Sequence, residues 1–526
     1  MRAKRSIGIE DWGDDIAIPM NPVHGMWSFV PGQEVPLGGS PDMMNCVVRA
    51  SLLTKRPGYS GFPAGMAAIG TRVMGLYSTQ DAENNTYLYA AHPTGLAVLT
   101  TLAGGWGAVT GAALTGSSEK LFNFETSQNS VVFSQGVDQV MKAVFGAGYA
   151  ILNASCPPAY YLSRWADRIF LGRTFETTSQ PFRVRRPVAS DHTDWTGLGS
   201  GFTDMVETPF HLRGLKKLSS QLAVYAEKAI YMGTRTELAE APARYQIQVT
   251  DIGLYAPYTL KGRNELHYFM GNDDVYMFNG AQIQSLGWQV RESIFPVLNI
   301  AKIHMMFGEI TFDTQEYLLF LCTGSSLTPD RVWVHNWARE IWYPWSVSGP
   351  CCSTVHRLDT GVTIDSIDQT IDSQTYEIDS LAAQADYPAL VTGHTDGKVY
   401  KWSKAYLSDN GVAIPCRWAS KDFTAKDVQG KYDEKIILKA VHVRYKETGA
   451  AATLAFWYSV NGGASWIGPD NMSLAAGTSG YAMASVFRQV TGNQIRIKFE
   501  NNTTTEDFQI VEIIPVFETP GSKVSV

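Results

Sequence analysis

The 526-residue sequence has few charged side chains and no long apolar run. Asp, Glu, Lys and Arg make up only 18% of it, and 50 acidic against 43 basic residues give a formal net charge of −7. A protein that binds nucleic acid through its phosphates normally carries a stripe of basic residues, and this sequence shows no such stripe. No run approaches the roughly 18 apolar residues of a membrane-spanning helix. The basic N-terminus lacks a following apolar region, so we expect no signal peptide.

Cysteine is also sparse, with six residues scattered along the chain and no C-x-x-C pair. This spacing does not fit a zinc site or a disulfide framework, and it favours buried free thiols. Cys351 and Cys352 are adjacent, so a bond between them would be strained.

Common catalytic motifs are missing as well. There is no G-x-S-x-G, no H-E-x-x-H, no phosphate-binding G-x-x-x-x-G-K-[ST] and no G-x-G-x-x-G after a strand. We therefore assign no catalytic, cofactor-binding or metal-binding residue, expect no cofactor, and do not expect an enzyme.

What the sequence does contain is one pattern three times, in residues 267–280, 317–337 and 389–402. Each copy is an apolar and aromatic run, a turn rich in Gly, Asn or Asp, and a returning run of alternating Val and aromatic residues. This pattern predicts β-hairpins, and their recurrence predicts a propeller or another array of sheets. Residues 212–233 fit either an amphipathic helix or a hairpin, and the likeness to their neighbours favours the hairpin.

The fold expected is therefore all-β, with three parts. Frequent prolines predict that residues 1–65 form an extended N-terminal arm. Residues 66–404 are expected to form an irregular β-propeller. Residues 405–526, in which apolar and polar residues alternate, are expected to form a β-sandwich. The polar insertion 359–386 is expected to be an exposed loop or hairpin.

Ser459 to Trp466 reads SVNGGASW and resembles the Asp box, a turn with the pattern S-x-D-x-G-x-T-W. Asn461 stands where Asp is usual, and Ser465 stands where Thr is usual. Gly462 and Gly463 would supply positive φ, and Trp466 would pack on the turn. The motif indicates β architecture and carries no chemistry.

Asp boxes also occur in sialidases, which leaves a glycan-binding or glycan-cleaving propeller as an alternative. Arg183, Arg185 and Arg186 could form a carboxylate-binding cluster, but alternation along a strand puts Arg186 on the opposite face.

Other polar residues have simpler interpretations. His335 and His394 have no partner at metal-ligand spacing. Asp273, Asp274 and Asp396 lie in predicted turns, where carboxylates usually accept backbone hydrogen bonds.

Six segments taken in order resemble the packaged-DNA stabilisation and tail-nozzle proteins of short-tailed bacteriophages. They are Asn45 to Tyr59, ending Arg-Pro-Gly-Tyr; RIFLG (168–172) with Asp194-Trp195; LAVYAEKAIY (222–231); DDVYMFNG (273–280); GHTDGKVYKW (393–402); and the β-rich tail with SVNGGASW. Residues 1–37 and 359–386 lie outside the resemblance.

The resemblance implies a virion structural protein made in the host cytoplasm, in a hexameric ring of propellers at the distal tail nozzle. Such a ring retains packaged DNA, lets it exit on ejection, and contacts portal-side adaptors and tail fibres or spikes. DNA would pass through without sequence-specific binding, which suits an acidic, weakly charged subunit. We expect an acidic or neutral inner wall, and a constriction made by loops such as 359–386. No membrane insertion is expected.

Arg56-Pro57-Gly58-Tyr59 is expected to form a type II turn, with Gly58 at positive φ. Tyr59 would then begin the strand that enters the propeller.

Overall fold

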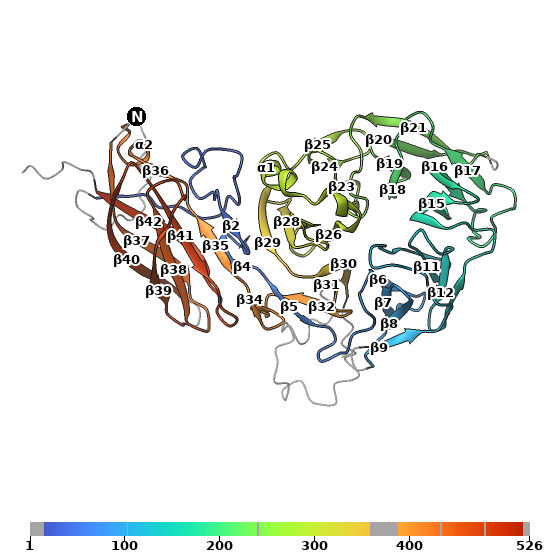
Figure 1. Cartoon of the computed structure of the whole chain (residues 1–526), viewed down its shortest axis with the longest axis horizontal. Coiled ribbons are helices and arrows are strands. Elements are labelled where there is room, and N and C mark those ends of the chain that lie inside the picture. Colours follow the sequence, from blue (N-terminus) through green and yellow to red (C-terminus); the bar gives the residue numbers. More distant parts are fainter. Residues whose placement is uncertain are drawn as a thin grey trace, which may run out of the picture. The chain divides into compact units, whose positions relative to one another are not determined.

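The computed structural model of the chain describes residues 15–101, 104–238, 241–357, 388–431, 434–477 and 480–518. It is built almost wholly of antiparallel strands (Figure 1). The chain forms two compact units: unit 1 comprises residues 1–58, 339–346 and 404–526, and unit 2 comprises residues 59–338 and 347–403. The insertion 359–386 lies outside the described residues.

Unit 2 contains seven antiparallel sheets. In six of them the neighbouring strands are consecutive in sequence, and the last sheet also takes in an early strand. The first three are β6(Gly75–Gln80), β7(Thr86–His92), β8(Gly95–Leu99) and β9(Trp106–Val109); β10(Asn123–Ser127), β11(Ser130–Ser134), β12(Met141–Val144) and β13(Tyr149–Ile151); and β14(Ala159–Trp165), β15(Arg168–Phe175), β16(Ser179–Arg186) and β17(Gly201–Asp204). The next two are β18(Leu212–Leu218), β19(Gln221–Ala226), β20(Ala229–Arg235) and β21(Ala243–Thr250); and β22(Lys261–Arg263), β23(Leu266–Met270), β24(Val275–Phe278) and β25(Ile283–Ser285).

The last two sheets follow a short helical stretch, α1(Arg291–Ile294), η1(Phe295–Val297) and η2(Ile300–Met305). They contain β26(Phe307–Thr311), β27(Glu316–Leu321) and β28(Arg331–Asn336), and then β30(Pro350–His356), β31(Ala389–His394) and β32(Val399–Ser403). Strand β5(Gly58–Gly61) completes the last sheet from the other end of the propeller segment, and the Phe62 N–H donates to the Val399 carbonyl at 2.8 Å.

The first strands of these sheets form a closed ring. β6 contacts β10, and the contacts continue through β14, β18, β22, β26 and β30 back to β6. Seven sheets arranged about one axis are a seven-bladed β-propeller, as Figure 1 shows on its right side. The apolar faces of successive blades pack together; for example, Trp165, Phe170 and Tyr231 share one buried cluster.

The hairpins predicted from the sequence are confirmed. The three repeated segments form β23–β24, β27–β28 and β31–β32, and residues 221–235 form the hairpin β19–β20 rather than a helix. The Asp-box turn is also present between β38(Ala452–Ser459) and β39(Ile467–Leu474). Gly462 and Gly463 have φ of 70° and 88°, and the Ser465 N–H donates to Asn461 Oδ1 at 3.0 Å.

Unit 1 contains two six-stranded antiparallel sheets. One has the order β3(Cys46–Arg49), β4(Leu52–Lys55), β42(Gln509–Glu518), β37(Ile436–Lys446) and β40(Tyr481–Gly492), with β1(Ile16–Ala17) on β42. The other has the order β2(Met43–Met44), β35(Cys416–Ala419), β41(Gln494–Asn501), β38(Ala452–Ser459) and β39(Ile467–Leu474), with β36(Phe423–Thr424) on β41. Unit 1 also holds β29(Ile341–Ser346), the hairpin β33(Ser408–Asp409) and β34(Val412–Ala413), and the helix α2(Ala425–Gln429). The two sheets touch where the rings of Phe423 and Phe517 lie 5.3 Å apart.

The division of the chain differs from the sequence-based expectation at its N-terminal end. Residues 1–65 were expected to be an extended arm, but the described part supplies strands β1 to β4 to the sheets of unit 1. Leu53 of β4, for instance, pairs with Ile510 of β42. The prolines lie outside these strands, so they do not prevent the pairing.

The expected type II turn at Pro57-Gly58 is wrong. Gly58 is not among the glycines at positive φ, and it begins strand β5. A close approach explains the glycine instead, because a Cβ on Gly58 would lie 2.2 Å from the carbonyl oxygen of Ser408. The expectation that the propeller strand starts at this position is confirmed.

Replacing Gly58 with Val should therefore destabilise the protein through overpacking, by about 1–3 kcal/mol of unfolding free energy. Gly61 is the matched control, because it lies in the same strand and its Cβ would have nothing within 4 Å. Urea unfolding of Gly58→Val and Gly61→Val measures the difference. Equal stabilities of the two variants would contradict the steric explanation.

Several histidines of unit 2 are buried, and desolvation lowers their pKa. The pKa values of His335, His356 and His394 fall to about 4, because a charged imidazole is penalised in an apolar interior. The unfolded chain, with histidine pKa values of about 6.5, then binds more protons between pH 6.5 and 4. Above pH 6.5 these histidines therefore do not lower the free energy of unfolding, and as the pH falls toward 4 they lower it progressively.

His356 provides the test, because its Nδ1 lies 2.9 Å from the Ser78 hydroxyl and Gln can keep that hydrogen bond without titrating. The loss of unfolding free energy between pH 7.5 and pH 5 should be smaller in His356→Gln than in the wild type, by about 1–2 kcal/mol. His24 is exposed, so His24→Gln is the control and should keep the wild-type pH dependence. Parallel pH profiles for His356→Gln and wild type would refute the burial argument.

Candidate functional site

The propeller lines a cavity of about 250 Å³. Its walls come from the first strands of all seven blades, so it lies on the propeller channel. A concave site with a few convergent polar side chains is a usual position for a ligand.

Four charged side chains line this channel cavity, one each from β10, β18, β22 and β26. They are Glu125, Lys216, Lys261 and Glu309. Lys261 Nζ lies 3.1 Å from Glu309 Oε2, and the Ser353 hydroxyl donates to the same oxygen, also at 3.1 Å. The Ile310 N–H donates to Glu309 Oε1 at 3.1 Å, so both oxygens of Glu309 have partners.

Glu125 and Lys216 are arranged differently, because neither forms an ion pair among the described residues, and the only hydrogen-bond partner of the Glu125 carboxylate there is the backbone of Arg164. Burial raises the pKa of Glu125, and the nearby Lys216 ammonium opposes this rise. Burial lowers the pKa of Lys216, and Glu125 opposes this fall. The charge of each group therefore shifts the pKa of the other, although no hydrogen bond or ion pair joins the two.

The arginines considered for a carboxylate site are already paired with carboxylates. Arg183 contacts Asp204 through two hydrogen bonds of 2.8 and 2.7 Å and reaches Glu176 at 3.1 Å. Arg185 contacts Glu176 at 2.9 Å. Arg186 is buried on the opposite face of β16, as alternation predicted. This arrangement does not present the open arginine cluster that a sialidase-type site needs.

The acidic residues of the predicted turns make local hydrogen bonds. The Tyr276 hydroxyl donates to Asp273 at 2.9 Å, and the Val275 N–H donates to Asp274 at 2.7 Å. Asp396 accepts from the Lys398 N–H at 3.0 Å and from the Tyr400 hydroxyl at 2.7 Å.

Neither histidine considered earlier has metal ligands around it. His394 Nε2 lies 3.0 Å from the Thr392 hydroxyl, and His335 is buried in β28. The described part of the chain holds no group of three or more His, Cys, Asp or Glu side chains placed to bind a metal ion. No helix within it is long and apolar enough to cross a membrane.

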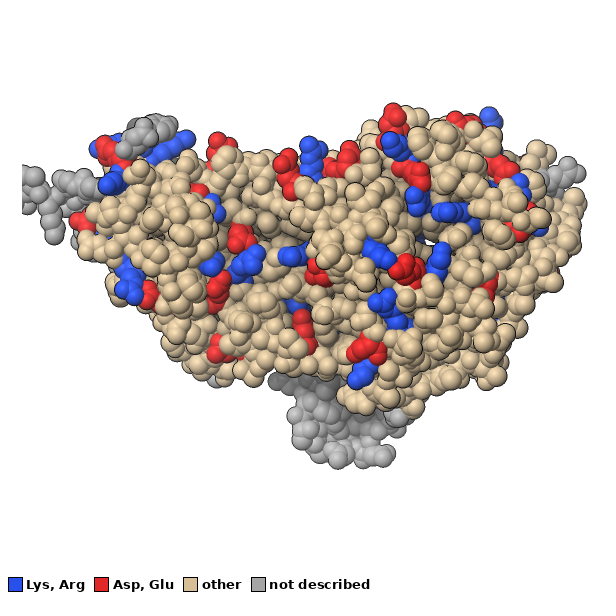
Figure 2. Space-filling view, viewed as in Figure 1, with Lys and Arg blue, Asp and Glu red and all other residues tan. Residues whose placement is uncertain are grey.

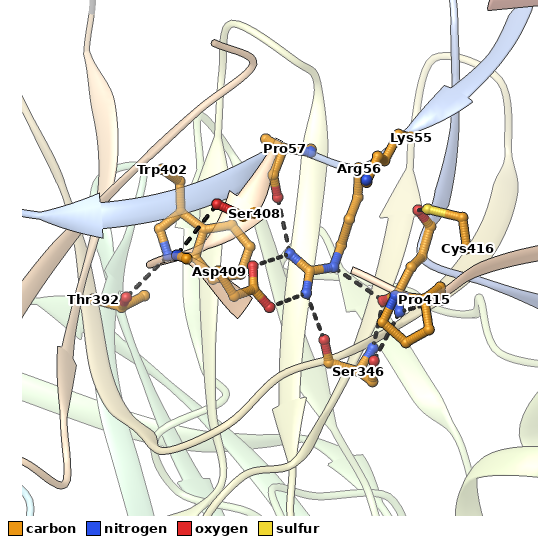
Figure 3. Close-up of polar contacts among 12 residues, drawn as sticks. Lys55, Arg56, Pro57, Ser346, Thr392, Trp402, Ser408, Asp409, Pro415 and Cys416 are labelled. Atoms are coloured by element: carbon orange, nitrogen blue, oxygen red, sulfur yellow. Dashed lines mark hydrogen bonds and ion pairs between the residues drawn. The ribbon is translucent and has the colours of Figure 1, made fainter. Parts of the chain in front are cut away.

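The second polar cluster is in unit 1, around Arg56, and we call it the Arg56 node (Figure 3). The guanidinium donates to Asn45 Oδ1 at 2.9 Å, to the carbonyls of Pro57 and Ser346 at 2.9 and 2.8 Å, and to both oxygens of Asp409 at 2.9 and 2.5 Å. These are five acceptors for its five N–H donors. The side chain of Arg56 is fully buried, and that of Asp409 is 13% exposed.

Asn45 completes the node from the other side of the β3–β4 hairpin. Its amide donates to the Ser346 hydroxyl and to the Pro415 carbonyl, both at 2.8 Å. Its backbone has φ of 57°, a left-handed conformation that Asn tolerates better than most residues. The conformation and the amide bonds together explain why Asn fits this position.

Sequence reasoning found the Arg56 segment but missed the channel cavity. The available signal was weak. Glu309 is a single charged residue in the short strand Phe307–Thr311, but the strand that carries Lys216 also contains Arg213 and Lys217, so Lys216 does not stand out. The sequence does not say which such strands line the axis.

Comparisons with known proteins match the fold alone. No family model matches the chain, and no curated protein matches it. Among solved structures, BamB from Moraxella catarrhalis is 12% identical with a TM-score of 0.35, covering 74% of this chain and 96% of its own. YCF48 from Cyanidioschyzon merolae is 8% identical with a TM-score of 0.32, covering 51% of this chain and 97% of its own. Both TM-scores lie below 0.5, so the all-β fold with a β-propeller rests on the sheets described above.

Truncating Arg56 should be severely destabilising, because Asp409 and Asn45 would lose partners in a buried site. For Arg56→Met we expect a loss of about 3–5 kcal/mol of unfolding free energy. The matched control is Arg488→Met, which removes an exposed arginine that pairs with Asp470 through two hydrogen bonds. That variant should lose far less, since exposed pairs contribute little. Equal losses in chemical denaturation would contradict the importance of the Arg56 node.

Proposed function

We propose that this chain is a structural subunit of a short-tailed phage tail, part of the distal nozzle that retains packaged DNA and releases it on ejection. In this proposal, six copies form a ring about the DNA exit path. Tail adaptors and fibres or spikes are the neighbouring proteins, and the DNA slides through without sequence-specific binding.

The observation that carries the proposal is the structure of the segment Asn45 to Tyr59, which resembles the tail-nozzle proteins. It begins at Asn45 and ends with Arg56 to Tyr59, and its two ends meet in the Arg56 node. Asn45, Arg56 and Gly58 each have a separate steric or hydrogen-bonding reason for their identity. Because these residues of the segment each have a structural role, their match to the tail-nozzle proteins supports a shared architecture better than an accidental match of a short sequence would.

Three of the other resembling segments lie in blade hairpins of the propeller. Residues 222–231 span β19 and β20, residues 273–280 contain β24, and residues 393–402 contain β32. In each case the segment contributes to a hairpin of one blade. The resemblance therefore follows the blade repeat.

The charge distribution suits passage of DNA. On the face in Figure 2, blue and red side chains are interspersed among a large neutral surface, and no basic patch is visible. A wall without excess positive charge does not hold phosphates, so it leaves DNA free to slide.

An edge strand of unit 1 suits assembly. β40 is the last strand of its sheet, and Tyr481, Met483 and Phe487 are 60%, 50% and 71% exposed. Its one charged residue, Arg488, is paired with Asp470. Proteins that remain monomeric usually protect long edge strands with charge, so a long uncharged edge supports contact with another subunit.

Variants of β40 test the assembly. Phe487→Lys should leave the melting temperature of the subunit nearly unchanged and reduce its incorporation into tails at least about tenfold, since burying an unpaired charge is costly. Thr491→Lys adds the same charge at another exposed position of the strand and should assemble normally. Incorporation of Phe487→Lys at the wild-type level would exclude β40 from the interface.

Electron microscopy of the particle tests the function itself. The reconstruction should show six copies of this chain around the exit axis of the tail, with an acidic or neutral lumen. A position away from the axis, or a strongly basic lumen, would overturn the proposal.

A further inference from the structure

The channel cavity contains two charged groups, Lys216 and Glu125, whose hydrogen-bonding capacity is largely unused by the described residues. Lys216 Nζ has three N–H donors, and no described residue accepts from it. Glu125 receives at most a backbone hydrogen bond, from Arg164. Both side chains are half-buried and line the hollow, so their polar atoms are open to whatever fills it. Charges removed from bulk water normally carry partners, because an unpaired charge is costly in such a site.

The surroundings do not supply these partners. Lys261 and Glu309 form an ion pair with each other, and Glu309 also accepts a hydrogen bond from the Ser353 hydroxyl. Tyr77, which also lines the cavity, shares its hydroxyl with Thr126 at 3.0 Å. Partners for these two groups are therefore supplied by water or by a ligand in the cavity.

The charges of the cavity wall indicate the net charge of a ligand that would fit it. Two carboxylates and two ammonium groups sum to zero, so an occupant with a net charge would leave an uncompensated charge in a low-dielectric site. An occupant with one carboxylate and one ammonium group would satisfy both unpaired residues and keep the site neutral. A cavity of about 250 Å³ is larger than the roughly 150 Å³ that holds a benzene molecule in an engineered protein core.

We propose that the channel cavity is a binding site for a small zwitterion of the amino-acid type, whose carboxylate is held by Lys216 and whose ammonium group is held by Glu125. The site belongs to unit 2 alone, and it does not depend on the role in a phage tail. Binding would join β10 to β18 across the channel.

Three probes with nearly the same skeleton test the proposal on the wild-type protein. L-alanine carries both charges, propionate carries only the carboxylate, and ethylamine carries only the ammonium group. In calorimetric titration near pH 7 L-alanine should bind, and each single-charge probe should bind on the order of tenfold or more weakly, because it leaves one buried ion unpaired. Absence of L-alanine binding, which would mean that water alone fills the cavity, overturns the proposal, and so does equal affinity for propionate.

Variants then locate the site. Lys216→Met and Glu125→Gln should each weaken L-alanine binding by about tenfold or more. Lys435→Met and Glu83→Gln make the same chemical changes at exposed positions and should bind as the wild type does. Unchanged affinity in both channel variants, with their melting transitions intact, would place any binding elsewhere. If a channel variant fails to fold, the comparison of the three probes on the wild type still decides the question.

Discussion

The buried guanidinium of Arg56 is the constraint on which unit 1 depends. It ties together three parts of the chain that are far apart in sequence: the β3–β4 hairpin, the end of β29 at Ser346, and the β33–β34 hairpin at Asp409. A buried charge is stable only when its donors are all matched, so these three segments have to meet in one geometry. The node lies at the point where the chain leaves unit 1, three residues before Tyr59 begins the propeller segment.

The propeller meets a different constraint, which is closure. Seven sheets can share an axis only if the last blade is completed, and β5 does this by joining strands that occur some 300 residues later. The first strands of the blades then converge, and their polar side chains are forced into the channel because the faces between blades are apolar. Glu125, Lys216, Lys261 and Glu309 thus come from four blades to one cavity.

Local features of this structure could be predicted from the sequence. The hairpins β23–β24, β27–β28 and β31–β32 depend on residues close in the chain, and so does the turn around Asn461. Features that depend on distant contacts could not be predicted. Gly58 was assigned to a turn because the Ser408 carbonyl that excludes a side chain there lies 350 positions away. The same limit explains why residues 1–65 resembled a free arm and why the charged residues of the channel could not be identified as a group.

Hydrogen exchange tests most directly the claim that the N-terminal segment is an integral part of unit 1. If the Arg56 node and the pairing of β4 with β42 hold this segment, the amides of residues 46–55 will exchange about as slowly as those of β37, which pairs with the same β42. Fast exchange throughout residues 46–55, with β37 still protected, would show instead that the segment is a loosely attached arm and would contradict the account.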